Sequence, residues 1–326
     1  VYLLTNVSEH KEIIESNGIN LIPLRFLKRS RINIVFELFS IVEIFLILKK
    51  IKPKILHSVA LKPVIYGSLV SYLFPKVKNI NALGGLGFIF SSGDIKARIL
   101  KPIVLNLLKL VFKRKRNKII VQNKDDYRFI FEELGIKKQN LTLIEGSGVD
   151  INKFSINQFS DKVPTVVLAS RMIWDKGIKE FVNAAKLLKL RGIKVKFIFV
   201  GKPDKENPNS IPEAILTKWK RLDFIDWIGY QSDMVEVFNK ASIVTLPSFY
   251  GEGIPKVLIE AMSCSRPIIT TKMPGCKDLV IDQINGILVK SKDHIDLADA
   301  LEKLICDPSL CKRMGLKGRE IVIEKY

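Results

Sequence analysis

Short apolar runs alternate with amphipathic stretches along the whole chain. Apolar runs of this length are typical of strands buried in a parallel sheet, and the stretches between them have helical spacing. The predicted strands are residues 54–57, 118–122, 142–145, 165–169, 195–200, 224–227, 243–246, 267–270 and 286–289. The predicted helices are residues 32–48, 64–74, 97–112, 124–134, 178–190, 256–264 and 297–306. This alternation predicts an α/β fold in which helices cover both faces of parallel sheets.

The length of 326 residues suits two domains of about 150 residues each. Asn, Ser, Gln and Asp accumulate between residues 150 and 164, just before a new strand, so we place the boundary there. The predicted domains are residues 1–153 and 154–326, each a doubly wound, Rossmann-like parallel sheet, facing each other across a cleft. Such sheets bind ligands outside the carboxyl ends of their strands, so the loops there are the places to search for chemistry.

The loop that follows the predicted strand 243–246 has the features of an anion site. Unpaired backbone N–H groups at a helix start favour anions, Gly253 lets the backbone approach a ligand, and Pro255 suits a first helical turn. Glu252 in the loop and Glu260 in the helix supply carboxylates for hydroxyls at two ends of a ligand. The layout fits a nucleotide sugar, although a turn followed by a surface helix produces the same spacing.

Two cations follow the first predicted strand of the second half. Arg171 and Lys176 lie between that strand and a helix, where they could bind a diphosphate through charge-assisted hydrogen bonds. A surface loop that is basic by chance would show the same two residues. Gly201 and Gly229 end the next two strands in ordinary strand-to-helix turns.

The loop motif, E-G-x-P followed by L-x-E-A, resembles that of family 4 glycosyltransferases, which are retaining enzymes of the GT-B fold. The resemblance implies that Arg171 and Lys176 clamp the donor diphosphate and that Glu252 holds the donor sugar. It assigns the ribose to Glu260 and a border of the nucleotide base to the two glycine turns. The donor-side residues are Gly201, Gly229, Gly253, Ile254, Pro255, Val257 and Glu260, beside the catalytic candidates Arg171, Lys176 and Glu252.

The first half resembles a bacterial subgroup that builds surface polysaccharides and lipid-linked oligosaccharides. Its glycine run lacks the third glycine of a dinucleotide fingerprint, with Phe90 in that place, so an NAD site is not expected. The subgroup motif H-x-H-x-x-K-P is matched in part, with Val59 at the second histidine. A tight turn explains Gly148 as well as a ligand role does. The acceptor-side candidates are His57, Lys62, Gly85, Gly87 and Gly148.

The net charge of +20 is concentrated in the first half. Residues 1–150 hold 25 Lys and Arg against 12 Asp and Glu, which gives +13, and the rest gives +7. Basic clusters at residues 25–31, 49–54 and 113–118 predict an anionic membrane surface as partner, with solvated surface as the alternative. Nucleic acid is not expected, because no zinc module, recognition helix or aromatic platform is present.

The apolar stretch 32–48 is interrupted by Glu37 and Glu43 and is shorter than the about 20 residues of a membrane span, so we expect a buried or interfacial helix. Without a secretory signal, the expected location is cytoplasmic, peripheral at the inner face of the plasma membrane. The cysteines Cys264, Cys276, Cys306 and Cys311 are expected to be reduced, and three histidines give little support to a zinc site.

The sequence therefore predicts a metal-independent retaining glycosyltransferase without a cofactor. The expected donor is a nucleotide diphosphate sugar, a UDP-sugar, and the acceptor is lipid-linked. Two alternatives are a sugar-nucleotide epimerase of similar fold and an inactive basic fragment that binds membranes. The resemblance also implies a first strand and glycine loop before Val1 and a closing helix beyond Tyr326.

Overall fold

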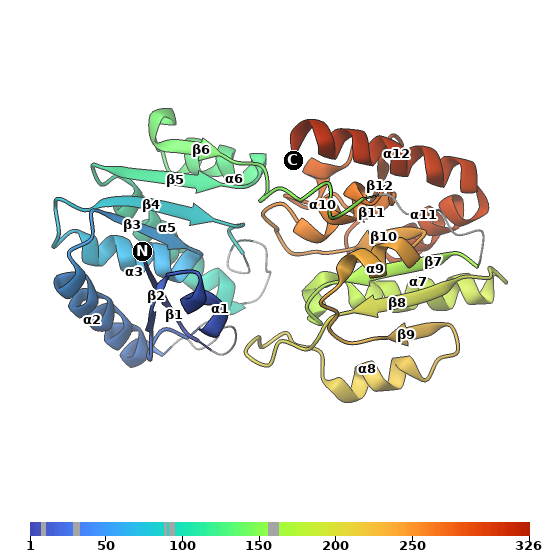
Figure 1. Cartoon of the computed structure of the whole chain (residues 1–326), viewed down its shortest axis with the longest axis horizontal. Coiled ribbons are helices and arrows are strands. Elements are labelled where there is room, and N and C mark those ends of the chain that lie inside the picture. Colours follow the sequence, from blue (N-terminus) through green and yellow to red (C-terminus); the bar gives the residue numbers. More distant parts are fainter. Residues whose placement is uncertain (8–10, 29–32, 88–89, 91–94, 156–162) are drawn as a thin grey trace.

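The computed structural model describes residues 1–7, 11–28, 33–87, 90, 95–155 and 163–326, arranged as two α/β domains side by side (Figure 1). The N-terminal elements are β1 (Tyr2–Thr5), α1 (Lys11–Ser16), β2 (Asn20–Pro23), α2 (Ile34–Ile51), β3 (Ile55–Val59), α3 (Leu61–Ser71), β4 (Lys78–Leu83), α5 (Ile95–Phe112), β5 (Asn117–Val121), α6 (Lys124–Arg128), a π-helical turn (Phe129–Glu133) and β6 (Leu141–Leu143).

The C-terminal elements are β7 (Thr165–Ala169), α7 (Ile178–Leu190), β8 (Lys196–Val200), α8 (Glu213–Lys220), β9 (Ile225–Trp227), α9 (Met234–Lys240), β10 (Ile243–Leu246), α10 (Lys256–Ser263), β11 (Ile268–Thr271), β12 (Gly286–Val289), α11 (His294–Cys306) and α12 (Pro308–Lys325). Short 3-10 turns lie at Lys138–Asn140, Trp174–Lys176 and Lys277–Leu279.

The C-terminal sheet has the strand order β12-β11-β10-β7-β8-β9, and all its pairs are parallel. The chain runs outward from β7 to β9, returns to β10 beside β7, and then runs outward the other way. The order therefore reverses between β7 and β10, and ligands of open α/β sheets bind at such a reversal. Alternate residues of β7 pack into two separate apolar clusters, which shows that helices bury both faces.

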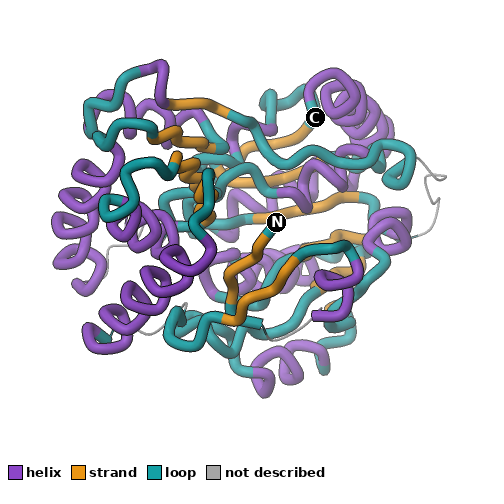
Figure 2. The backbone as a smooth tube through the Cα atoms, turned by 60° about the vertical axis from the view of Figure 1, so that its left-hand side comes forward, coloured by secondary structure: helices purple, strands orange, loops and turns teal. Residues whose placement is uncertain are grey.

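The N-terminal sheet is built in chain order, β3-β4-β5-β6, again with parallel pairs. The strands β1 and β2 form a separate parallel pair near the N-terminus (Figure 2). One apolar cluster lies between this sheet and α3, α5 and the π-helical turn, and a smaller cluster lies under α2.

The predicted α/β architecture with parallel sheets is confirmed. Strands 165–169, 243–246 and 286–289 and helix 178–190 have the predicted bounds, whereas β2, β4, α8, α9 and α12 were not predicted. Part of the predicted boundary region, residues 156–162, lies outside the described residues, and the division at 153/154 stays a prediction. None of the helices in the described part of the chain is long and apolar enough to cross a membrane. The four cysteines are free thiols, as predicted.

Candidate active site

The charged candidates meet at the reversal point of the C-terminal sheet. Arg171 and Lys176 follow β7, and Glu252 follows β10, the neighbouring strand. Because the carboxyl ends of parallel strands lie at one edge of a sheet, the two loops share that edge. The sequence places these residues more than 70 positions apart, as the 76-residue separation of Lys176 and Glu252 shows, and the topology brings them together.

Lys176 and Glu252 form an ion pair in the structure. The two side chains are only 11% and 14% exposed, so their attraction is weakly screened by water. Ser248 Oγ also donates a hydrogen bond of 3.0 Å to the same Glu252 oxygen. A cation and a carboxylate are therefore held together at one position, and a hydroxyl fixes the carboxylate from a second direction.

Gly177 allows the two loops to approach this closely. Its φ is +74°, and a Cβ placed there would lie 2.1 Å from the carbonyl oxygen of Pro247. A backbone hydrogen bond of 3.0 Å from Phe249 N to Asp175 O joins the same two loops. Only glycine combines that backbone angle with that contact, so Gly177 fixes where Lys176 lies.

Arg171 pairs with Asp204 across the ends of β7 and β8, with Nη1 and Oδ2 2.5 Å apart. The turn that carries Asp204 depends on Gly201, where a Cβ would lie 1.8 Å from Ser170 O. Gly201 N donates to Gly229 O at 2.7 Å. The two predicted glycines thus shape the edge on which Arg171 lies, and base contact by either stays a prediction.

Glu260 lies in α10, which begins at Lys256 with Pro255 as the residue before it. Its side chain is 12% exposed and lies 3.5 Å from Lys256 Nζ. Burial raises the pKa of this carboxyl above its usual value, although the charge of Lys256 opposes the shift. Val257 is half-buried in the same turn. A shielded carboxylate of this kind favours hydroxyl donors as partners.

Ile254 is buried and packs inside the protein. Its Cγ2 would lie 3.2 Å from a Cβ at Gly146, which comes from the N-terminal domain. Its side chain is thus used in packing, and the donor contact of Ile254 stays a prediction. We interpret Ile254 as an apolar anchor of the loop between Gly253 and α10.

The glycine run of the N-terminal domain abuts the Glu252 loop. A Cβ at Gly85 would lie 3.0 Å from both Glu252 C and Gly253 N, and one at Gly87 would lie 2.8 Å from Tyr250 Oη. The two predicted acceptor-side glycines thus lie directly against the donor-side loop. Residues 88, 89 and 91–94, the continuation of this run, lie outside the described residues.

Lys62 lies in α3 and His57 in β3, and their acceptor-side roles stay predictions. Lys62 Nζ lies 2.6 Å from Glu37 Oε1 and donates to Lys28 O at 2.9 Å, so it joins α3 to α2. His57 is an exposed residue in the middle of β3, and the strand continues two residues past its predicted end.

Gly148 lies in a turn with φ +72°, where a Cβ would be 2.9 Å from the backbone oxygen of Tyr326. The tight-turn explanation accounts for this glycine without a ligand. The described contact lies beside the C-terminal end of α12.

Gly275 was not predicted as a site residue, yet its Cα lies against the backbone of the Glu252 loop. A Cβ there would lie 1.7 Å from Gly253 O and 2.6 Å from Glu252 O. The next residue, Cys276, is buried, and burial together with the Glu252 charge raises the pKa of its thiol to about 12. The thiol is therefore neutral. The Pro-Gly dipeptide at 274–275 signals a turn, but nothing local predicts what the turn contacts.

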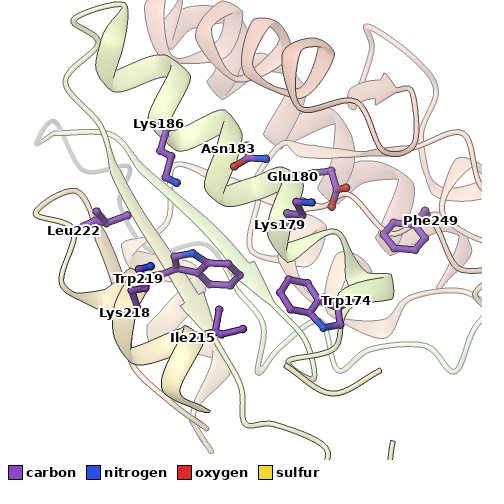
Figure 3. A pocket seen from close by; sticks show the side chains of 10 residues that line it. All are labelled: Trp174, Lys179, Glu180, Asn183, Lys186, Ile215, Lys218, Trp219, Leu222 and Phe249. Atoms are coloured by element: carbon purple, nitrogen blue, oxygen red, sulfur yellow. The ribbon is translucent and has the colours of Figure 1, made fainter. Parts of the chain in front are cut away.

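A separate cavity of about 680 Å³ lies between α7 and α8, beside this site (Figure 3). Trp174 and Trp219 line it, packed edge to face with ring centres 6.0 Å apart. Its lining includes Phe249 from the Glu252 loop but neither Glu252 nor Lys176. We place the candidate site at the charged pair, because diphosphate chemistry needs cations at the strand ends.

The family model described as glycosyl transferases group 1 matches residues 150–321. The chain is a group 1 glycosyltransferase. A second model, glycosyl transferase 4-like, matches residues 1–123 of this glycosyltransferase. These matches confirm the predicted family and activity, and they support transfer and not the epimerase alternative.

Known proteins resemble the glycosyltransferase over almost its whole length. The N,N'-diacetylbacillosaminyl-diphospho-undecaprenol alpha-1,3-N-acetylgalactosaminyltransferase of Campylobacter jejuni is 27% identical over 95% of this chain and 83% of its own. Sucrose-phosphate synthase of Thermosynechococcus elongatus superposes with a TM-score of 0.80 at 19% identity, over 100% of this chain and 84% of that one. Anabaena HepE in complex with UDP superposes with a TM-score of 0.74 at 17% identity, over 97% of this chain and 85% of that one. These neighbours confirm the GT-B fold.

Proposed function

We propose that this glycosyltransferase moves a sugar from a UDP-sugar to a hydroxyl of a lipid-linked saccharide, with retention at the anomeric carbon. The observation that carries the proposal is the shielded pair of Lys176 and Glu252 at the sheet reversal. The name of the Campylobacter relative supports a lipid-linked acceptor, and the HepE complex supports UDP. Retention follows from the family resemblance.

The ion pair suggests how donor binding proceeds. A diphosphate entering between the loops competes with Glu252 for Lys176, because phosphate oxygens are strong acceptors for an ammonium group. Glu252 is then free to accept hydrogen bonds from donor-sugar hydroxyls. Arg171, whose side chain is 41% exposed, adds a second cation to the leaving diphosphate. Glu260 accepts the ribose hydroxyls.

The site assignment is tested by UDP calorimetry on Arg171→Gln and Glu260→Gln. Both substitutions are compatible with the fold, because Arg171 is partly exposed and Glu260 carries a costly buried charge. Each should weaken UDP binding roughly tenfold, as expected for one charged hydrogen bond. The matched control is Arg191→Gln, which removes an arginine paired with Asp299 and Glu302 away from the site. Wild-type affinity in both site variants would contradict the assignment.

Transfer itself is tested with UDP-N-acetylglucosamine, UDP-N-acetylgalactosamine and UDP-glucose, each with and without an undecaprenyl-diphosphate-linked saccharide. Donor consumption should require the lipid acceptor. It should continue unchanged in EDTA, because the proposal assigns neutralisation of the phosphates to Arg171 and Lys176 and not to a metal ion. Loss of all turnover in EDTA would contradict the metal-independent part of the proposal.

We further propose that α2 carries the membrane-facing surface. Its exposed apolar residues are Ile34, Val35, Phe36, Leu38, Phe39, Val42 and Leu46. Both of its carboxylates point inward: Glu37 accepts from Lys62 and Tyr66, and Glu43 accepts from the backbone N–H groups of Arg25 and Phe26. The exposed face of the helix is therefore apolar and free of acidic groups.

Basic residues complete this surface. Lys49 and Lys50 lie in the last turn of α2, and Lys52 and Lys54 follow the helix, all exposed. The helix lies on the side of the N-terminal domain away from the C-terminal domain (Figure 1). Apolar side chains beside clustered lysines suit an anionic bilayer surface, where each basic residue contributes about 1 kcal/mol. Cosedimentation with phosphatidylglycerol vesicles but not with phosphatidylcholine vesicles is the expected result, and equal recovery with both would oppose it.

A further inference from the structure

Asn123 joins the two domains at the Glu252 loop. It is fully buried at the start of α6, and its Nδ2 donates 2.8 Å hydrogen bonds to Glu252 O and to Asp126 Oδ2. Its Oδ1 accepts from Asp126 N at 2.7 Å, which caps the helix. Both amide hydrogens and the amide oxygen are thus used, so the orientation of the amide is fixed.

Asp126 determines that orientation. Its carboxylate is 6% exposed and accepts from Asn123 and from the backbone N–H of Leu86 in the glycine run. An ionised carboxylate is only an acceptor, so it must face the NH₂ side of the Asn123 amide. The same NH₂ group then faces the Glu252 carbonyl. One carboxylate thereby connects α6, the glycine run and the donor-side loop.

The charge on Asp126 is costly for folding. Burial raises the pKa of its carboxyl to about 6; hydrogen bonds from Asn123 and Leu86 oppose the shift, whereas the charges of Asp125 and Asp278 add to it. Asp125 is itself paired with Lys277 of the C-terminal domain at 2.9 Å. A raised folded-state pKa means that protonated Asp126 stabilises the fold at low pH, and that this stability is lost as pH rises through about 6. At neutral pH the ionised carboxylate of Asp126 therefore does not stabilise the folded protein.

We propose that Asn123 and Asp126 are positioning residues that hold the Glu252 backbone against the glycine run, so that turnover requires ionised Asp126. The inference rests on the proposed role of Glu252 at the donor sugar. When Asp126 is protonated, the carboxyl gains a hydrogen and loses part of its capacity as an acceptor. The bond from Asn123 Nδ2 to the carboxyl, one of the two bonds to Asp126 that orient the amide toward Glu252, is then weakened. The loop that carries Glu252 then becomes more mobile, while the cap of α6 by Asn123 Oδ1 can persist.

The first test uses Asn123→Ser, which keeps a capping oxygen but is too short to reach the Glu252 carbonyl. We expect kcat to fall about tenfold with a donor KM within about twofold, because a misplaced catalytic loop lowers turnover more than binding. The control is Asp293→Ser, which alters the cap of α11 outside the site. Hydrogen exchange of residues 250–254 should increase in Asn123→Ser and not in the control. Unchanged exchange and unchanged kcat would overturn the proposal.

The second test is the pH profile. Wild-type kcat should fall as pH drops through about 6. Asp126→Asn should have low kcat that is flat from about pH 5 to 7.5, with a melting temperature at pH 7.5 no lower than wild type, because a buried charge has been removed. An unchanged acid limb in Asp126→Asn would overturn the proposal. If wild type binds no UDP and transfers no sugar, the proposed function fails instead, and the exchange experiment still reports on the Asn123 contact.

Discussion

The two domains have similar sheets but different interiors. In the C-terminal sheet, β10 and β11 are buried at every position and largely aliphatic, and charge is kept at the strand ends. In the N-terminal sheet, the interior strand β4 buries Asn79 and Asn81 at alternate positions. In β10 and β11 the buried polar groups are threonine hydroxyls bonded to backbone carbonyls, whereas β4 buries two amide side chains.

The two amide side chains of β4 are bonded from strand to helix. Asn79 Nδ2 donates to Ser71 Oγ at 2.7 Å, and Asn81 Nδ2 donates to Ser68 Oγ at 3.0 Å and to Asn117 Oδ1 at 2.7 Å. These bonds offset the cost of burying the amide groups, except at Asn79 Oδ1, which has no hydrogen-bond partner, and they favour one arrangement of β4, β5 and α3. The C-terminal sheet provides a rigid edge for charges, whereas the N-terminal sheet fixes the register of the glycine run that follows β4.

The largest effect should come from breaking the charged edge. Replacing Lys176 with Met leaves the Glu252 carboxylate shielded and unpaired, which should lower the free energy of unfolding by about 3–5 kcal/mol. Lys240→Met removes an exposed pair, with side chains 69% and 64% exposed, and should cost less than about 1 kcal/mol. Urea unfolding measures both. Equal costs would show that the charged edge behaves as ordinary surface.

The second effect concerns the backbone under that edge. Gly275→Ala should lower turnover roughly 100-fold, because the new methyl group displaces the carbonyls of Glu252 and Gly253. Gly192→Ala is the matched control: its φ is also +77°, but no atom lies within 4 Å of the added Cβ. Steady-state rates of the two variants separate loop displacement from backbone strain. Similar rates would mean that strain alone explains the loss.

The third effect compares the two interiors directly. Asn81→Ala leaves Asn117 Oδ1 without its donor, so it should lower the free energy of unfolding by about 1–3 kcal/mol. Thr245→Val removes a buried hydroxyl from β10 that donates to Ile269 O at 2.8 Å, but it keeps the shape and should cost about 1 kcal/mol. Denaturant unfolding of both variants measures the two losses of free energy. A larger loss in Thr245→Val than in Asn81→Ala would contradict the proposed difference between the two interiors.

The same contrast explains what the sequence predicted. Strands β7, β10 and β12 matched their apolar runs because their buried positions are apolar, apart from Thr245 in β10. Strand β4 was missed because Asn79 and Asn81 occupy buried positions, and their bonding partners lie on segments that only folding brings together. The pattern of hydrophobic positions reports apolar burial and does not report satisfied polar burial.

The candidate site divides along similar lines. Arg171, Lys176, Glu252 and Glu260 could be selected from their loops, since charge after a strand end is a local signal. Their pairing, by contrast, depends on β7 lying beside β10. Gly275 and Asn123 were missed as site residues because their importance comes from contacts with a distant loop. Lys62 was selected by motif, yet its ion pair with Glu37 lies outside that motif.

The smallest expected effect tests the outer surface, where the two domains also differ. On α2, Leu38 and Val42 are 58% and 51% exposed on the helix whose last turn carries Lys49 and Lys50, whereas Leu190 at the end of α7 is 85% exposed in the other domain. Leu38→Glu or Val42→Glu should weaken binding to phosphatidylglycerol vesicles about tenfold, because each introduces a charge into the apolar face that we propose as the lipid-facing surface. Leu190→Glu adds the same charge elsewhere and should leave vesicle binding within about twofold, since a charge distant from the surface is largely screened. Recovery with vesicles across a salt series measures all three, and equal losses would show that net charge, rather than the α2 face, governs attraction to the bilayer.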